Sequence, residues 1–317
     1  SIIWDWGGEA SVDIIAREAG VSIDYARLFC ESLGREGCID FLGSKLCKIK
    51  SKGKAMENEK TIRILCCVEA GSRVWHLSSK DSDYDVRFVF ARPLEEYIRI
   101  DPSDDVIMAH FDKDCNRMRQ EGCYIDVSGF DAFKYSRMLS SSNPTAIEWL
   151  QSDIVYYGEK PKAWIEYATK HFKPISLYFH YKSMCKQNYV KYLKSGNEVT
   201  YKKYLYAMRG LVNSKHVANT KTLPFIDFTK ELDYISKLNA KIKNDKRQIV
   251  KNNIVISLQG MIKLKKEGKE KDIIQNISKI DNFIEEFLKD DSDAPKDKKL
   301  ITTTELNNEL RRIVLTR

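Results

Sequence analysis

The alternation of apolar and polar positions divides the chain into a short N-terminal module, a strand-rich middle and a long helical remainder. In the first fifty residues, apolar positions follow the helical period over 9–18 and 23–33. Two strand-like runs, 38–42 and 46–49, then flank a Gly-Ser turn. This order of helix, turn, helix and hairpin is typical of a winged helix-turn-helix. Such modules bind DNA or dock proteins, and the pattern leaves both roles open.

Three apolar runs rich in Ile, Val, Phe and Cys predict strands in the middle of the chain, at 61–70, 85–92 and 122–130. The segment 93–121, between the last two, is charged and irregular. From residue 131 onward the pattern is mostly helical, with Asp131 placed to cap one helix and Asn143-Pro144 placed to open the next. Together these elements predict an α+β fold.

Five further helical segments are predicted in the C-terminal half, at 174–194, 198–217, 227–244, 246–266 and 270–289. The last carries a continuous apolar stripe, which is typical of a helix that faces a core. The charged stretch 289–299 is expected to be a flexible link to a short terminal segment. We therefore expect three domains: the winged-helix-like module (1–55), a domain built on the strands (56–160) and a helical domain (161–317).

The net charge of +8 conceals a difference between the two halves of the chain. Residues 1–160 hold 21 Lys and Arg against 27 Asp and Glu, whereas residues 161–317 hold 32 against 18. The acidic half contains a cluster of aspartates, and the basic half has the charge to face a polyanion such as a nucleic acid. Lysine-rich helices are also ordinary solvated surfaces, so charge alone does not decide between these roles.

The eight cysteines form no C-x-x-C pair and lie among apolar residues. This is typical of reduced, buried thiols rather than of a zinc site. No apolar run approaches the ~18 residues needed to span a bilayer. The start of the chain lacks the basic and apolar regions of a secretory signal. We therefore expect a cytoplasmic protein with no membrane partner.

Most candidate functional side chains lie close together in residues 68–90, VEAGSRVWHLSSKDSDYDVRFVF. A glycine directly after a strand lets the backbone approach a ligand, and Ser72 adds a hydroxyl. A helix that began at Ser72 would direct its free N–H groups at the same place, where they would bind a phosphate. Arg73 could donate two hydrogen bonds to the same phosphate. Gly71, Ser72 and Arg73 are therefore candidate nucleotide-binding residues.

The aspartates of this window are candidate metal ligands. Asp83 and Asp85 are two residues apart, so in a strand both side chains share one face. Two such carboxylates can hold Mg²⁺ or Mn²⁺, and the ion keeps open positions for triphosphate oxygens. A two-metal site needs a further carboxylate, and Asp126, on what is predicted to be an adjacent strand, is the natural third. The alternative is that this D-x-D is an exposed turn surrounded by water.

Three basic residues further along the chain are additional candidates for nucleotide binding. Lys134 falls near the start of a predicted helix, where it either reaches a phosphate or faces solvent. Lys203 and Arg209 lie on a helix with interleaved tyrosines. There they either take up the charge of a triphosphate or belong to an ordinary amphipathic helix.

These motifs, taken together, resemble a known family. GSR, then DSDYDVRFVFARPLEEYI, IDVSGFDAFKYSRMLSSSNPTAIEWLQSDIVY, YFHYKSMCKQNY and KKYLYAMRGL are similar to the RlaP family. Its members are predicted nucleotidyltransferases of the DNA polymerase β superfamily, associated with RNA repair. The resemblance covers about residues 62–235. It implies a nucleotidyltransferase palm with a small mixed sheet, followed by a helical domain.

The resemblance also implies roles for the candidate residues. Gly71 and Ser72 would hold the triphosphate, and the three acids, Asp83, Asp85 and Asp126, would carry the metals. His76 stands where the family usually has a small residue, as a rule glycine, which leaves open the shape of the turn after Trp75.

We therefore predict a metal-dependent nucleotidyltransferase that uses an NTP, with ATP the expected one, to transfer NMP to an acceptor hydroxyl. A nucleic-acid end, RNA in preference, is the first acceptor because of the basic half and the family association. A protein hydroxyl is the second, which would make the protein an AMP-transferring enzyme. A third hypothesis is a nucleotide-sensing regulator whose winged-helix module binds DNA.

Overall fold

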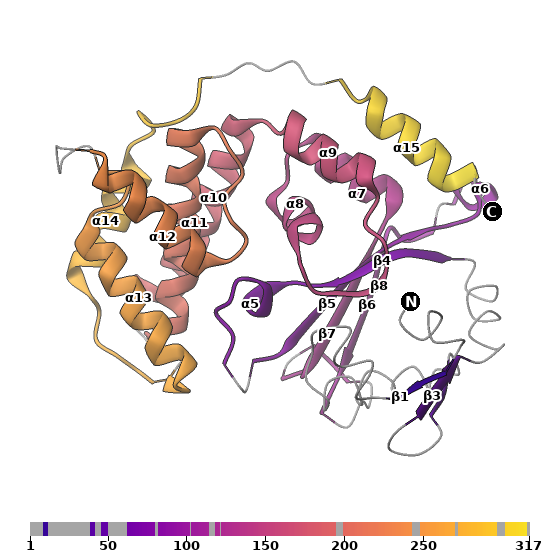
Figure 1. The fold of residues 1–317 in the computed structure, drawn as a ribbon, viewed down its shortest axis with the longest axis horizontal. Coiled ribbons are helices and arrows are strands. Elements are labelled where there is room, and N and C mark those ends of the chain that lie inside the picture. The colour runs from indigo at the N-terminus through magenta and orange to yellow at the C-terminus, as the bar shows by residue number, and fades with distance from the viewer. Residues whose placement is uncertain are drawn as a thin grey trace.

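A computed structural model describes residues 9–11, 39–41, 46–49, 62–79, 82–101, 103–113, 118–120, 122–194, 199–242, 248–269, 272–296 and 302–315. A five-stranded mixed sheet with the order β6-β7-β5-β4-β8 forms its middle, and helices flank it (Figure 1). The strands are β4 (Arg63–Glu69), β5 (Tyr84–Ala91), β6 (Val106–Phe111), β7 (Ile125–Asp131) and β8 (Val155–Gly158). The predicted α+β fold is confirmed for these residues.

The sheet contains two strands that the sequence did not reveal. β5 and β7 pair in parallel, β6 pairs with β7 antiparallel, and β8 pairs with β4 antiparallel. The prediction that 93–121 is irregular is therefore wrong over β6. The sequence of β6, VIMAHF, has no clear alternation of apolar and polar residues. Pairing along the edge of β7, rather than its own pattern, makes it a strand.

Four helices pack around the sheet: α7 (Ala132–Ser140), α8 (Pro144–Gln151), α9 (Lys162–His171) and α15 (Thr304–Leu315). The Asp131 carboxylate accepts from Phe133 N at 2.8 Å and so caps α7, as predicted. Asn143 caps α8 through Thr145 N at 2.9 Å, and Pro144 takes the first turn, also as predicted. The C-terminal α15 returns to pack against α7 and α9 (Figure 1).

Five helices, with a short π-helical continuation of one of them, gather on one side of the sheet (Figure 1). They are α10 (Pro174–Asn188) with its short π-helical continuation η1 (Tyr189–Leu193), α11 (Tyr201–Thr220), α12 (Phe228–Ala240), α13 (Asn252–Lys266) and α14 (Ser278–Lys289). Gly210 lets α10 and α11 pack closely, because a Cβ there would lie 2.8 Å from the backbone of Cys185. In α14 the stripe residues Ile280 and Ile284 are fully buried, which confirms a core-facing helix over 278–289. The prediction is wrong over 272–277, which precede the helix and where Ile273 is exposed. No described helix combines the length and apolarity that crossing a bilayer requires.

Near the N-terminus, β1 (Glu9–Ser11), β2 (Ile39–Phe41) and β3 (Leu46–Ile49) form a separate sheet with the order β1-β3-β2. The predicted hairpin is confirmed by the antiparallel pairing of β2 with β3. The prediction of a helix over 9–18 is wrong at its start, because β1 pairs with β3 and short isolated helices are marginal. The two predicted helices otherwise fall in 12–38, outside the described residues, so the winged helix stays a prediction.

Candidate active site

Two of the predicted carboxylates meet where β5 and β7 begin. Asp85 lies directly opposite Asp126 in the parallel pairing, so both side chains leave the same face of the sheet. On β6, His110 lies opposite Asp126 with its Nδ1 3.0 Å from Asp126 Oδ1, although without hydrogen-bond alignment. Asp83 directly precedes β5 and is exposed. The neighbouring Asp81 lies outside the described residues.

A nearby thiol indicates that all three predicted acids act on one region. Cys123 lies two residues before β7, and burial raises the pKa of its thiol. The negative charges of Asp126, Asp83 and Asp85 raise that pKa further. The three carboxylates therefore lie near enough to the start of β7 to act electrostatically on this thiol.

The Gly-Ser turn lies directly against this end. It forms α5 (Gly71–Val74), a single helical turn after β4, in which Ser72 is buried. Gly71 has φ +62°, and a Cβ there would lie 2.0 Å from Asp85 Oδ2. Only glycine therefore fits both the backbone and the carboxylate. The N–H of Ala70 donates to Asp85 O at 2.8 Å and holds the turn beside β5.

Arg73 links the turn to the backbone before β5. Its guanidinium lies 3.5 Å from the centroid of the Tyr84 ring. It also donates to the carbonyl oxygens of Ser82 at 2.6 Å and Asp83 at 3.2 Å. A phosphate bound here would share the guanidinium with these carbonyls, so the phosphate-binding role of Arg73 stays a prediction.

Arg87 lies between the two paired acids. Its Nη2 donates to Asp85 Oδ1 at 2.8 Å and to Asp126 Oδ2 at 2.7 Å. Burial raises the pKa of Asp85, Arg87 opposes this rise, and the carboxylates of Asp126 and Asp83 add to it. One guanidinium thus holds two mutually repelling carboxylates at close range.

A lysine that was not among the predicted residues affects the pKa of Asp85. The pKa of Asp85, which burial raises, is lowered in part by the positive charge of Lys202 at the start of α11. The next residue, Lys203, has its Nζ 5.5 Å from the centroid of the Tyr192 ring on η1. Consecutive helical residues point about 100° apart, so the two lysines face different surroundings.

Arg209 belongs to a buried cluster that holds the residue after the turn. Glu148 on α8 accepts hydrogen bonds from Arg209 Nη2, from Trp75 Nε1 at 3.0 Å and from Tyr181 Oη at 3.1 Å. The Arg209 guanidinium also lies 3.8 Å from the centroid of the Trp75 ring, and Phe228 N donates to Trp75 O at 3.1 Å. We call Trp75, Glu148, Tyr181 and Arg209 the clamp. Arg209 is 3% exposed, so its described contacts position the turn.

His76 follows the clamp in the conformation that a glycine would readily adopt. The φ of His76 is 56°, in the left-handed region, which costs residues other than glycine roughly 1–2 kcal/mol. Its Nδ1 lies 3.8 Å from Asp227 Oδ2, at the start of α12. The turn after Trp75 therefore keeps a glycine-compatible shape despite the larger side chain.

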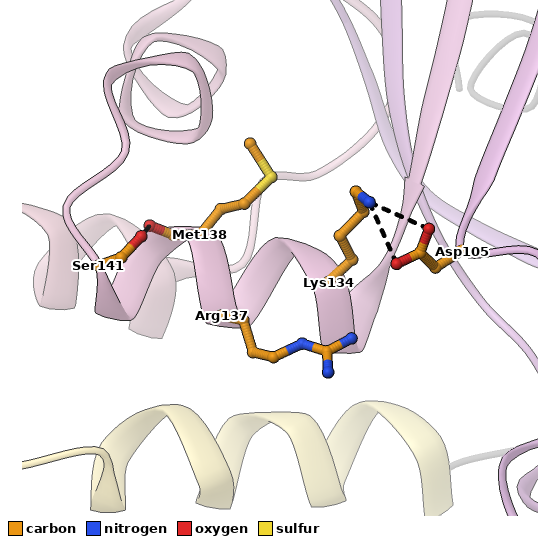
Figure 2. A pocket seen from close by; sticks show the side chains of 5 residues that line it. All are labelled: Asp105, Lys134, Arg137, Met138 and Ser141. Atoms are coloured by element: carbon orange, nitrogen blue, oxygen red, sulfur yellow. Dashed lines mark hydrogen bonds and ion pairs between the residues drawn. The ribbon is translucent and has the colours of Figure 1, made fainter. Parts of the chain in front are cut away.

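Lys134 lies at the other end of β7 from the aspartates. Asp126 and Asp131 are about 17 Å apart at the usual rise of a strand, and Lys134 follows on α7. There its Nζ pairs with Asp105 Oδ1 at 3.0 Å (Figure 2). Both residues line an open pocket of about 480 Å³ together with Arg137, whose side chain extends toward α15 (Figure 2). The structure therefore does not bring Lys134 to the carboxylates.

Glu69 is a buried acid that was not among the predicted site residues. At the end of β4, its Oε1 accepts from Asp85 N at 2.7 Å and Ala70 N at 3.2 Å, and its Oε2 accepts from the Tyr156 hydroxyl. Burial raises its pKa to about 7, although these hydrogen bonds oppose the rise. A single acid at the end of an apolar strand was the available sequence signal. Glu69 joins the turn to the first residues of β5.

The stability of the protein is expected to fall as pH rises through about 7 because of Glu69. The pKa of Glu69 is about 7 in the folded state and about 4.5 ordinarily, so the folded state binds the proton more tightly. The resulting contribution to stability is complete below about pH 4.5 and is lost as the pH rises through 7. Across this window the free energy of unfolding should decrease by about 3 kcal/mol. The Glu69→Gln variant should lose this part of the decrease, measured by urea denaturation from pH 5 to pH 8. Parallel pH curves for the two proteins would contradict the assignment.

The donor set suits a hard divalent cation. Among the described residues, no three His, Cys, Asp or Glu side chains already converge as a metal-binding group. However, Asp85 and Asp126 offer oxygen ligands on one face, and Arg87 already places positive charge between them. Asp83 lies two residues away with an exposed side chain. Carboxylate oxygens are the ligands that Mg²⁺ and Mn²⁺ prefer.

Comparisons with known proteins identify the family of this chain. Residues 48–312 match the family model described as RlaP, RNA repair pathway DNA polymerase beta family. The uncharacterized protein YcgL of Bacillus subtilis (strain 168) is 31% identical over 266 residues, which are 83% of this chain and 92% of that protein. A nucleotidyltransferase-like protein from Exiguobacterium sibiricum 255-15 is 11% identical, with 68% of this chain and 76% of that chain covered. Its TM-score of 0.27 does not establish a shared fold. Because the family model spans most of its length, this chain belongs to the RlaP family of DNA polymerase β-like nucleotidyltransferases.

Proposed function

We propose that the protein transfers NMP from an NTP, with ATP the expected one, to an acceptor hydroxyl in a reaction that depends on Mg²⁺ or Mn²⁺. The observation that carries this proposal is the pairing of Asp85 with Asp126 beside a turn whose Gly71 touches Asp85. A polyphosphate bound at the turn would end next to the carboxylates. Membership of a nucleotidyltransferase family supports the same chemistry.

We assign a role to each group of residues in the site. Asp83, Asp85 and Asp126 would hold the metal, which supplies Lewis acidity at the α-phosphate when it is bound. Ser72 and the N–H groups of the turn bind the β- and γ-phosphates, and Arg73 adds positive charge.

The transfer itself is a displacement at the α-phosphorus. The acceptor oxygen attacks the α-phosphorus while Asp126 takes its proton. The bond to the β-phosphate oxygen then breaks, and pyrophosphate leaves. Lys202 lies close enough to act electrostatically on Asp85, so it would also stabilise the negative charge of the bound triphosphate.

An RNA 3′ end is the acceptor we favour. The half of the chain after residue 160 has an excess of Lys and Arg, 32 against 18 acidic residues, which suits a polyanion. The family description refers to an RNA repair pathway. A protein hydroxyl is the alternative acceptor, and it would receive AMP.

Incubation with α-³²P-labelled NTPs, Mg²⁺ or Mn²⁺, and either total RNA or total protein tests the proposal. We expect label on RNA, dependent on the metal and removed by ribonuclease. Label on protein would instead support the AMP-transferring alternative. No label on either, together with binding of the full chain to duplex DNA, would overturn transfer and favour the nucleotide-sensing regulator.

A further inference from the structure

We infer that Arg87 acts as a built-in counter-cation that competes with the metal for Asp85 and Asp126. The inference rests on the proposed function, because it takes a divalent cation to bind these acids. It concerns how readily the site accepts that cation, which neither the family assignment nor the predicted ligand set addresses.

A single nitrogen of Arg87 forms both contacts with the acids. Nη2 lies 2.8 Å from Asp85 Oδ1 and 2.7 Å from Asp126 Oδ2. The other nitrogen, Nη1, donates to the main-chain oxygens of Asp126 at 2.7 Å and Val86 at 3.1 Å. The guanidinium is therefore anchored to the backbone independently of the carboxylates, and only Nη2 stands where a cation would bridge them.

The two cations demand different geometry from the same oxygens. Mg²⁺ bonds oxygen at roughly 2.0–2.1 Å, shorter than the contacts to Nη2, so a bound ion would draw the oxygens closer than Arg87 holds them. The Arg87 side chain is 15% exposed, so its charge is poorly screened by water. To bind, the metal must therefore displace the charge-assisted hydrogen bonds of Arg87 to Asp85 and Asp126, and this cost lowers the apparent affinity of the site for the metal.

Removing Arg87 is expected to tighten metal binding. Without it, Asp85 and Asp126 face each other with no positive charge between them, and a divalent cation relieves the repulsion. We expect the Arg87→Met variant of the full chain to bind Mn²⁺ roughly tenfold more tightly than the wild type, within the usual range of coupling between sites. The measurement is a titration of Mn²⁺ followed by the electron paramagnetic resonance signal of free Mn²⁺, without NTP.

The matched control is Arg92→Met, which removes the same charge just after β5. The Arg92 Nη2 bonds the carbonyl of Asp104, away from the two acids. We expect its Mn²⁺ affinity to stay within about twofold of the wild type. Equal tightening in both variants, or unchanged or weaker binding by Arg87→Met, overturns the inference. Should Arg87→Met fail to fold, Arg87→Gln carries the test, because it removes the charge and keeps a side-chain amide that can donate hydrogen bonds. Mn²⁺ should then bind more tightly than to the wild type, and equal or weaker binding overturns the inference.

The same titration separates this inference from the proposed function. If wild-type binding is lost in the Asp83→Ala/Asp85→Ala variant while Arg87→Met binds like the wild type, only the role of Arg87 is wrong. If the double variant binds Mn²⁺ as well as the wild type does, the metal assignment itself is wrong, and the inference is overturned with it.

Discussion

Replacing Asp83 and Asp85 together by alanine is expected to abolish nucleotidyl transfer, with a fall in rate of at least about a thousandfold. Loss of one preorganised electrostatic contact with a transition state costs roughly 10²–10³ in rate, and this change removes two carboxylates. The fold should persist, because Asp83 is exposed and burial already penalises the charge of Asp85. Arg87 also keeps its contact with Asp126. Incorporation of label from an α-labelled NTP measures the activity, and circular dichroism checks the fold.

The matched control is Asp101→Ala with Asp104→Ala, which removes two exposed acids before β6 in the same domain. Its transfer rate should stay close to that of the wild type. A wild-type rate in the Asp83→Ala/Asp85→Ala protein would show that the acids do not hold the metal. A fall of equal size in the control would show that the effect comes from net charge.

Breaking the clamp is expected to have the largest effect on stability. In Arg209→Met, Glu148 loses its charged partner in surroundings where its side chain is only 11% exposed. Removing one partner of a buried ion pair typically costs about 3–5 kcal/mol. Trp75 also loses the cation over its ring. We therefore expect the free energy of unfolding, measured by urea denaturation, to fall by about 3–5 kcal/mol.

The clamp also distinguishes two roles for Arg209. If Arg209 acts through Glu148, the double variant Glu148→Met/Arg209→Met should be less destabilised than the sum of the single variants, because neither charge is left unpaired. If Arg209 instead bound the nucleotide directly, Arg209→Met would keep its stability and lose NTP affinity. Additive losses in the double variant would also contradict the clamp.

Features that depend on a few neighbouring residues could be predicted from the sequence. The apolar runs marked β4, β5 and β7, and the caps at Asp131 and Asn143 marked helix starts. The glycine after β4 marked a close approach of the backbone to a neighbouring side chain. Each of these follows from a local period or a local backbone requirement, so no knowledge of distant partners was needed.

Features that depend on partners distant in the sequence could not be predicted from the sequence. β6 and β8 became strands because β7 and β4 offered them edges, not because of their own pattern. Lys202, at the start of α11, lowers the pKa of Asp85 over a long sequence separation, and no local pattern marked this effect. Lys134 looked close to the site in sequence, yet the length of β7 carries it away.

The sequence by itself therefore determined where the strands and the glycine turn lie along the chain, because local apolar runs mark strands and a glycine marks a turn of special backbone conformation. Only the tertiary structure decided which side chains lie between the acids and which ones support the turn. Arg87 reaches Asp126 across a strand pairing, and Arg209 reaches Glu148 across two helices, over sequence separations of 39 and 61 residues. Such contacts form only when the whole chain is packed, because long-range pairing is selected by the total burial of the fold rather than by any local pattern.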